Sequence, residues 1–404
     1  MLMQIADSPS GSVANIPANY TEALAGSYTL PDPLKLASGK AVKDAKTWNT
    51  TRRPEILHLF EQQQFGRMPG RPKQVKYDVF DKGTPALDGK AIRRQVTLVF
   101  SPEQKVDVVL YLPAGATRPS PVLLNAAFSA NSNTVEDAGI RPGEVWNPKD
   151  KKRMPASAAR RFGSLKVEPF LAAGIGVATV YYGDFDPDFD GGLGLGVRSL
   201  YPKPGPEEWG TISAWAWGLS RVLDYLETDT GVDARRVALT GVSRLGKTVL
   251  WAGAHDQRFA AVIASCSGEG GAALSRRDYG ETVAHLVAPT RYAYQFAANY
   301  GNHAAKPRES PVDGHLLLSL IAPRPLLLQT GDTDKWSDPY GEFLAAVAAG
   351  PVYRLLGQQD LGVDKMPRPG EAILNTLGFL IHAGGHGTIP ADWPVFVEFL
   401  KRHL

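Results

Sequence analysis

The chain has 404 residues, of which 43% are hydrophobic and 21% charged, a composition typical of a globular protein with a large core. Its 44 Lys and Arg nearly balance its 41 Asp and Glu, and the net charge of +3 is not gathered into a long basic run, so no nucleic-acid-binding surface is indicated. No apolar stretch approaches the ~18 residues that a membrane span needs, and the single cysteine, Cys266, excludes an internal disulfide.

The first part of the chain predicts a surface segment followed by antiparallel strands. Residues 1–50 are polar and rich in Pro, Ser and Asn, and we expect 1–70 to wrap the surface of a single catalytic domain that spans 1–404. Apolar residues at near-helical spacing predict a helix over 53–64. Alternating apolar and polar residues predict antiparallel strands at 75–80, 92–100 and 106–112.

From Pro121 onward, the strands read as unbroken apolar runs separated by helical segments. Such runs are typical of a parallel sheet that helices cover on both faces. We therefore predict an α/β fold, a three-layer α/β/α sandwich around a mostly parallel, twisted sheet. The predicted strands are 122–126, 177–182, 237–240, 262–265, 326–330 and 377–382, and the predicted helices are 157–173, 211–228, 244–255, 340–349 and 393–403.

Two stretches lack regular periodicity. Residues 128–156 are polar, and loops of that length within a compact domain usually build a binding cleft or a lid. We therefore expect 127–175 to be a cleft-forming insertion. The glycine-rich residues 191–196 superficially resemble a dinucleotide-binding turn, but they lack the strand-to-helix context and the matching acid, so a flexible loop is predicted.

Residues 235–252 have the layout of a strand–turn–helix elbow. A short apolar strand ends at Thr240, Gly241 and Ser243 form the turn, and a helix-forming stretch follows. This layout lifts a serine hydroxyl to the top of a sheet, where it can act as a nucleophile. Glycines flank such a turn because its strained backbone leaves no room for side chains. Gly246 lies one place later than the usual Gly-x-Ser-x-Gly pattern would put it.

A serine nucleophile needs a base and an acid that orients the base. In α/β hydrolases the acid follows a late strand and the histidine follows the last one. The predicted strand 326–330 leads into three candidate acids, Asp332, Asp334 and Asp338. Asp334 is predicted to be the acid because a Gly-x-x-Asp turn at a strand end aims its side chain at the site. Asp338 could instead cap the next helix, and Asp332 could hold the turn.

Two histidines lie at and after the end of the last predicted strand, 377–382. His386 is predicted to be the base because it lies in a glycine-rich loop that is free to reach the serine, whereas His382 still belongs to the strand. Both histidines could also suggest a metal. The glycines between them oppose the helix that would bring both side chains to one face, and no cysteine or glutamate motif completes a site, so no metal site is predicted.

The serine segment resembles a known family. Gly-Val-Ser-Arg-Leu-Gly-Lys, residues 241–247, is similar to the Gly-Cys-Ser-Arg-x-Gly-Lys signature of glucuronoyl esterases, carbohydrate esterase family 15. The resemblance covers most of the chain. Further matching segments are Leu30-Pro31-Asp32-Pro33, Trp48 with 52–56, 60–61 with 65–67, the Ser-Gly-Glu-Gly-Gly-Ala run at 267–272, and Gly384-Gly385-His386-Gly387 with Asp392-Trp393.

The resemblance implies an α/β-hydrolase fold that works without a cofactor. Enzymes of this family cleave the ester between 4-O-methyl-glucuronic acid on xylan and lignin alcohols. By this resemblance, Ser243 is the nucleophile and His386 the general base. Arg244 would stabilise the oxyanion through its backbone N–H and its guanidinium; one such donor typically contributes about 2.7–4 kcal/mol of transition-state stabilisation.

The resemblance also implies sugar-binding residues. Lys247 lies one helical turn after the serine, so both can line one cleft, and the matching lysine of the family hydrogen-bonds sugar hydroxyls. Glu281 and Trp336 match further sugar-contacting positions. A tryptophan there gives a flat apolar wall for a pyranose ring, although packing is the alternative role for Trp336.

One departure from the family pattern concerns the acid. Many members carry a catalytic glutamate 23 residues after the serine, and this chain has Cys266 there. Other bacterial members place the acid after the seventh strand, which corresponds to Asp334. A triad without an acid would lose up to about 10⁴ in rate. Glu269, close to Cys266, is an alternative for the acid. A further alternative is that Asp338 shares the acid role with Asp334.

The neighbourhood of Ser243 is predicted to be cationic. Positive charge favours a developing oxyanion and a glucuronate product. The residues expected to rim the cleft are Arg244, Lys247, Arg276, Arg277 and Lys335, with solvated side chains as the alternative for Arg276 and Arg277.

Two other functions stay open: an acetyl-xylan or general carboxylesterase, and a carbohydrate-binding relative without catalysis. The expected partner is the glucuronoxylan or lignin–carbohydrate ester substrate, with neither nucleic acid nor membrane, and a monomer is expected. Residues 1–12 lack the basic start and apolar run of a signal peptide. The family resemblance nevertheless implies a secreted or periplasmic enzyme of lignocellulose degradation.

Overall fold

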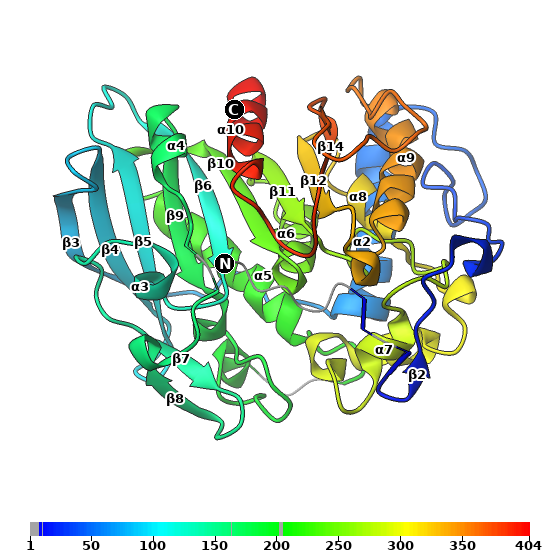
Figure 1. Cartoon of the computed structure of the whole chain (residues 1–404), viewed down its shortest axis with the longest axis horizontal. Helices are drawn as coiled ribbons and strands as arrows, with labels where there is room; N and C mark the ends of the chain where they lie inside the picture. Colours follow the sequence, from blue (N-terminus) through cyan, green and yellow to red (C-terminus); the bar gives the residue numbers. More distant parts are fainter. Residues whose placement is uncertain (1–7, 10, 163, 202–204) are drawn as a thin grey trace.

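The fold is built on one central sheet (Figure 1). The structure is a computed structural model that describes residues 8–9, 11–162, 164–201 and 205–404. Ten strands form the sheet in the order β13-β14-β12-β11-β10-β6-β9-β5-β4-β3. Their bounds are β3 (Lys76–Ala86), β4 (Ala91–Val99), β5 (Lys105–Pro113), β6 (Ser120–Ala127), β9 (Gly176–Tyr181), β10 (Val232–Val242), β11 (Ala261–Ser265), β12 (Leu326–Gly331), β13 (Ala372–Ile373) and β14 (Leu377–His382).

The direction of the strands follows their sequence pattern. The six strands β9, β6, β10, β11, β12 and β14 run parallel, and every residue of β9, β11, β12 and β14 is buried. At one edge, β3, β4 and β5 pair antiparallel. Continuous apolar runs therefore occupy the centre of the sheet, where both faces are covered, and each predicted strand is confirmed.

Helices cover both faces of the sheet, which confirms the three-layer sandwich (Figure 1). One face packs Leu124, Leu239 and Val262 against α5, α6, α8 and α9. The next residues along the strands, such as Leu123 and Ile263, point to the other face and pack against α4 and α10. The helices are α1 (Ala45–Thr47), α2 (Arg53–Phe60), α3 (Asn131–Thr134), α4 (Glu168–Ala172), α5 (Thr211–Leu226), α6 (Arg244–His255), α7 (Val283–Val287), α8 (Gly314–Ser319), α9 (Pro339–Leu355) and α10 (Asp392–His403).

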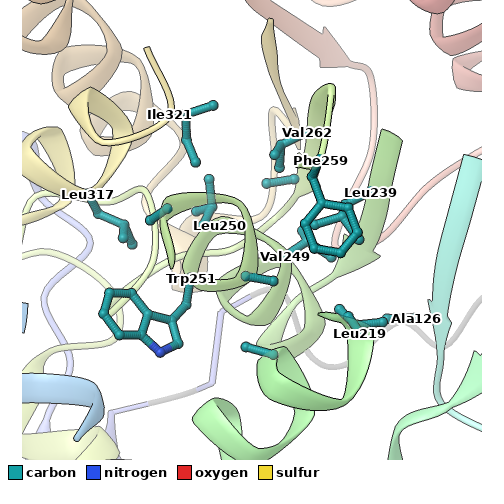
Figure 2. Close-up of a cluster of buried hydrophobic side chains, with 14 of the residues drawn as sticks. Ala126, Leu219, Leu239, Val249, Leu250, Trp251, Phe259, Val262, Leu317 and Ile321 are labelled. Atoms are coloured by element: carbon teal, nitrogen blue, oxygen red, sulfur yellow. The ribbon is translucent and has the colours of Figure 1, made fainter. Parts of the chain in front are cut away.

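Helix α6, which begins directly after Ser243, is anchored in the main core (Figure 2). Side chains from β10, β11, α5 and α8 surround its buried residues Val249, Leu250 and Trp251. A Cβ on Gly253 would lie 2.6 Å from the side chain of Val262, so a larger residue would push the helix off the sheet. Burial of each large apolar side chain contributes about 1.5–3 kcal/mol. The helix that carries the serine segment is thus held rigidly.

Two predictions from the sequence need correction. Among the described residues of 157–173, which exclude 163, the predicted helix is wrong except at its end, because α4 begins only at Glu168 with Pro169 in its first turn. Proline lacks an N–H and disfavours helix in the residue before it, so Pro169 favours a helix that starts at Glu168 over one that continues from further upstream. The polar stretch 128–156 contains a hairpin of β7 (Glu144–Asn147) and β8 (Lys152–Pro155) that the sequence analysis did not predict.

The N-terminal segment lies against the helix layer through specific contacts. Arg53 is buried, and its Nη2 donates to the carbonyl of Leu320 at 3.2 Å. His285 Nε2 lies 3.1 Å from the carbonyl oxygen of Ile16, where β2 (Ile16–Pro17) pairs with β1 (Ser12–Val13). Residues 1–7 and 10 of the expected wrap lie outside the described residues. Within the part that the structure describes, every helix is too short or too polar to cross a membrane.

Candidate active site

Ser243 lies in the tight turn between β10 and α6 that the sequence predicts. Its backbone has φ 60° and ψ −126°, a region that residues with a side chain rarely adopt, and such a conformation costs about 1–3 kcal/mol. A Cβ on Gly241 would lie 2.5 Å from the carbonyl oxygen of Leu245, and one on Gly246 would lie 2.8 Å from that of Ser265. Glycine at both positions therefore permits the turn that presents the Ser243 hydroxyl.

The predicted acid and base are in direct contact. Asp334 Oδ2 lies 2.7 Å from His386 Nδ1, with the carboxylate fully buried and the imidazole side chain 10% exposed. Asp334 follows β12, and His386 follows β14, the neighbouring strand. The loop of His386 is held close, because the N–H of Thr333 donates to the carbonyl of Gly384 at 3.0 Å. His386 and Ser243 line the same two cavities.

The other candidate acids have different partners. Asp332 Oδ1 accepts the N–H of Gly384 at 2.8 Å and so holds the turn. Asp338 Oδ1 accepts the N–H of Gly341 at 2.9 Å and caps α9, while its Oδ2 pairs with Arg277 at 2.8 Å. Both carboxylates thus have the structural tasks that the sequence analysis gave as their alternatives.

Glu269 is also engaged elsewhere. Its Oε1 accepts hydrogen bonds from Ser275 Oγ at 2.6 Å and from the Tyr300 hydroxyl at 3.0 Å. Burial raises the pKa of Glu269 to about 8. A carboxyl group that stays protonated at neutral pH does not supply the charge that an imidazolium partner requires.

Cys266 lies close to the His386–Asp334 pair. Its Sγ accepts the N–H of Gly387 at 3.3 Å. The sulfur, an Asp334 carboxylate oxygen and a His386 ring nitrogen all lie within 4.8 Å of one another. Burial raises the pKa of the thiol well above its usual value, with the nearby Asp334 carboxylate adding to the effect. The residue at this position is therefore a neutral spacer that leaves the charge to Asp334.

Two cavities of different character meet at Ser243 and His386. The larger, about 310 Å³, is walled mainly by apolar and aromatic side chains. The smaller, about 70 Å³, is walled by charged and polar ones. The apolar walls are Ala126, Ala127, Phe128, Phe162, Leu165, Tyr182 and Trp393, and the polar cavity adds Lys247, Cys266, Glu281, Arg291, Tyr292, Gln295, Asp334, Trp336 and Ser337.

The polar cavity brings together the predicted sugar-binding residues. Glu281 Oε1 pairs with Arg291 Nη2 at 2.7 Å, and the Arg291 guanidinium lies 5.3 Å from the Trp336 ring centre. Burial lowers the pKa of Lys247, whose side chain lies in the same cavity. Trp336 is 9% exposed and packs edge-on against His285, so its ring both packs and forms part of the wall. Arg291, which no motif singled out, completes this group.

The cationic rim is only partly as predicted. Arg244 and Lys247 line the cavities. The prediction is wrong for Arg276 and Arg277, which are buried and form ion pairs of 2.8 Å with Asp313 and Asp338. These carboxylates come from distant parts of the chain, so the sequence alone did not reveal the pairing. Lys335 is exposed.

Arg244 does not extend freely into the site. Its Nη1 pairs with Asp188 Oδ2, and its guanidinium lies 4.7 Å from the Tyr292 ring centre. Burial alone would lower its pKa, but the Asp188 carboxylate outweighs that effect and holds the pKa of Arg244 well above its usual value. The guanidinium is therefore charged and fixed in direction.

Comparisons with known proteins agree with this geometry. A family profile described as "Glucuronyl esterase, fungi" matches residues 149–357. The chain is 42% identical to the carbohydrate esterase MZ0003 from an unknown prokaryotic organism, over 96% of this chain and 92% of that protein. Among solved structures, a glucuronoyl esterase from Solibacter usitatus superimposes with a TM-score of 0.90 at 44% identity, covering 95% of this chain and 100% of that one.

A second solved structure, described as a promiscuous CE15 esterase from the marine bacterial metagenome, has a TM-score of 0.87 at 41% identity and covers 96% of this chain and 100% of that one. These similarities run over nearly the whole length of both chains. The chain therefore belongs to the glucuronoyl esterase family, carbohydrate esterase family 15, and is a carboxylic-ester hydrolase with the α/β-hydrolase fold.

Proposed function

We propose that this enzyme hydrolyses the ester between 4-O-methyl-glucuronic acid on xylan and a lignin alcohol, through an acyl-enzyme on Ser243. The observation that carries the proposal is the meeting of a polar and an apolar cavity at Ser243. A uronate ester has the same two-sided character, because a sugar with several hydroxyls lies on one side of the ester and an aromatic alcohol on the other.

The proposed reaction proceeds in two halves. In the first, His386 takes the proton of Ser243 Oγ as the oxygen attacks the ester carbonyl carbon, and Asp334 stabilises the imidazolium that forms. The carbonyl electron pair moves to oxygen, where the backbone N–H and guanidinium of Arg244 stabilise the charge. Collapse of this intermediate breaks the bond to the alcohol, which leaves with the proton from His386. In the second half, water repeats these steps and releases glucuronate from Ser243.

The polar cavity is the proposed site for the sugar. Lys247 and Glu281 offer a donor and an acceptor to its hydroxyls, and Trp336 offers an apolar wall for its ring. Arg291 holds the Glu281 carboxylate at 2.7 Å and so fixes the acceptor in place. The aromatic side chains of Phe128, Phe162 and Trp393 in the other cavity suit an arylalkyl alcohol.

The test compares hydrolysis of benzyl glucuronate with that of p-nitrophenyl acetate by the wild-type enzyme, with Ser243→Ala as the control. We expect efficient cleavage of the uronate ester that Ser243→Ala abolishes. Turnover of the acetate without the uronate would overturn the proposed substrate. If Ser243→Ala keeps both activities, Ser243 is not the nucleophile.

A second candidate function is an acetyl-xylan or general carboxylesterase. The apolar cavity, about 310 Å³ against about 70 Å³ for the polar one, favours the general carboxylesterase, because an ester with an apolar alcohol can bind there without a sugar in the polar cavity. The relative described as a promiscuous CE15 esterase supports it further. A ratio of kcat/KM that favours acetyl esters over benzyl glucuronate would establish it in place of the first.

We also propose that the chain acts as one catalytic domain, a monomer exported to degrade lignocellulose. In this proposal, residues 1–70 are a structural wrap and 127–175 a cleft-forming insertion. Phe128, Phe162 and Leu165 in the lining of the apolar cavity support the second assignment; Gly163 of the insertion lies outside the described residues. Light scattering on the purified protein tests the monomer.

A further inference from the structure

A buried carboxylate behind Arg244 collects four hydrogen-bond donors. Asp188 Oδ2 accepts from Arg244 Nη1 and, at 2.9 Å, from the Tyr182 hydroxyl. Its Oδ1 accepts from the Tyr294 hydroxyl at 2.9 Å and from Gln295 Nε2 at 2.7 Å. The Asp188 side chain is 9% exposed. Because an ionised carboxylate offers about four acceptor positions, the described donors fill them all and fix the carboxylate in place.

The same group of residues connects the two cavities. Tyr182 lines the apolar cavity, whereas Gln295 and Tyr292 line the polar one. Arg244 lies between them, with its guanidinium 4.7 Å from the Tyr292 ring centre and its Nη1 on Asp188. An arginine has several rotatable bonds, so a fixed partner on one edge decides where its remaining N–H groups point.

A neighbouring ion pair offers a comparison within the same segment. Asp186, two residues earlier, pairs with Arg198 at 2.8 Å, and Arg198 Nη2 donates to Thr211 Oγ1 at 2.9 Å. This pair is more deeply buried than that of Asp188, and it joins a loop to the start of α5. Asp186 thus has a structural partner, whereas the partner of Asp188 is the residue directly after the nucleophile.

We propose that Asp188 is a positioning residue for the ester hydrolysis: it orients the Arg244 guanidinium toward the developing oxyanion and balances its charge. The proposal rests on the proposed function in one respect, the role of Arg244 as an oxyanion donor. Two consequences follow. Without the carboxylate, the guanidinium loses its alignment, and a misplacement of about 1 Å can cost about 10²-fold in rate. The unbalanced positive charge then also binds the anionic product, glucuronate, more tightly.

The test uses Asp188→Asn, which keeps the shape of the side chain and removes its charge. We expect kcat on benzyl glucuronate to fall about 10²-fold with little change in KM, and product inhibition by glucuronate to become stronger. Asp186→Asn is the matched control, because it removes a buried charge two positions away. It is expected to lower the thermal midpoint while kcat stays within about threefold. An equal fall in kcat in both variants would overturn the proposal.

A double-mutant cycle with Arg244→Gln isolates the interaction. If Asp188 acts through Arg244, Asp188→Asn lowers kcat by less than about twofold in the Arg244→Gln background. Full additivity of the two losses contradicts the proposal. The cycle is run on p-nitrophenyl acetate as well, since every ester forms an oxyanion. If the wild-type enzyme does not cleave benzyl glucuronate, the proposed function is wrong. The cycle on p-nitrophenyl acetate then still tests the role of Asp188.

A milder variant covers the case in which Asp188→Asn does not fold. Tyr294→Phe removes one hydroxyl donor from Asp188 and keeps both the carboxylate and Arg244. Its control is Tyr300→Phe, which removes a hydroxyl donor from the buried Glu269, 3.0 Å away. We expect kcat to fall about three- to tenfold in Tyr294→Phe, the loss of one hydrogen bond of about 1 kcal/mol, and less than about twofold in Tyr300→Phe. Equal values of kcat in the two variants would contradict the role of Asp188.

Discussion

Two histidines four residues apart, His382 at the end of β14 and His386 in the loop after it, each pair with an aspartate, and the two pairs differ in what surrounds them. His386 Nδ1 lies 2.7 Å from Asp334, and His382 Nδ1 lies 3.0 Å from Asp392. The His386 side chain lines both cavities beside Ser243. The His382 side chain is 4% exposed, and its Nε2 lies 3.1 Å from the carbonyl oxygen of Gly385.

A histidine–aspartate contact is not by itself a catalytic feature. Both ring nitrogens of His382 are engaged by other groups: Nδ1 lies 3.0 Å from Asp392 Oδ2 and 3.0 Å from Gln329 Nε2, and Nε2 lies 3.1 Å from the Gly385 carbonyl oxygen. His382 lines neither cavity beside Ser243, and its role is therefore structural: it holds the Gly385 backbone next to His386.

The largest predicted effect separates the two aspartates. We expect Asp334→Asn to lower kcat on benzyl glucuronate by up to about 10⁴-fold, because the amide no longer stabilises the imidazolium of His386. Asp392→Asn is the matched control and is expected to lower kcat by less than about tenfold while reducing stability. Steady-state kinetics and thermal unfolding of both variants check the pair of outcomes. Similar losses of kcat would contradict the division between the two pairs.

The second prediction concerns stability. We expect His382→Gln to lower the free energy of unfolding by about 3 kcal/mol, because the substitution leaves the buried Asp392 carboxylate without its charged partner. Denaturant unfolding measures this change. His58→Gln, at a histidine whose side chain is 49% exposed, is the control and is expected to stay within about 0.5 kcal/mol of the wild type. An equal, small change in His382→Gln and His58→Gln would show that the His382–Asp392 pair contributes nothing to stability.

The third prediction gives the pH dependence of that contribution. Burial by itself lowers the pKa of His382, but the hydrogen bond and charge of Asp392, with Gly385 and Asp332, outweigh burial and raise the pKa above 6.5. The stabilisation is therefore fully present below pH 6.5 and is lost as the pH rises through the raised pKa. The difference in unfolding free energy between wild type and His382→Gln should be larger at a pH of about 5.5 than at about 9. A difference that grows with pH would contradict this assignment.

The smallest predicted effect concerns Cys266, which lies close to the His386–Asp334 pair. Cys266→Ser keeps a small, neutral group that can still accept the N–H of Gly387. We expect kcat to stay within about a factor of three, or about 0.6 kcal/mol in the barrier. Kinetics on benzyl glucuronate check this value. A loss as large as that of Asp334→Asn would mean that the thiol, rather than Asp334 alone, supports His386.

Short sequence patterns predicted much of this fold and of the candidate site. The apolar runs of the parallel strands, the glycines around Ser243, and the polar turn with Asp334 each depend on short stretches of sequence, and the structure has them where the pattern predicts. The prediction of a helix over 157–173 was wrong because α4 begins only at Glu168, with Pro169 in its first turn. The β7–β8 hairpin lies in a stretch whose polar composition hides its alternation.

Long-range contacts set the limit of sequence reasoning. The ion pairs of Arg276 with Asp313 and of Arg277 with Asp338 join residues 37 and 61 positions apart, so their burial had no local signal. Asp188 lies 56 positions from Arg244, and Arg291 belongs to no motif. A basic residue directly after a nucleophile could have prompted a search for a buried acid, but the sequence does not say which of 41 acidic residues it is.

The proposed acyl-enzyme on Ser243 is best tested by mass spectrometry of the wild-type enzyme quenched in acid during turnover of benzyl glucuronate. We expect a glucuronoyl adduct on the peptide that contains Ser243, absent in Ser243→Ala. Turnover without an adduct on that peptide, or an adduct on the peptide of Cys266, would contradict this proposal.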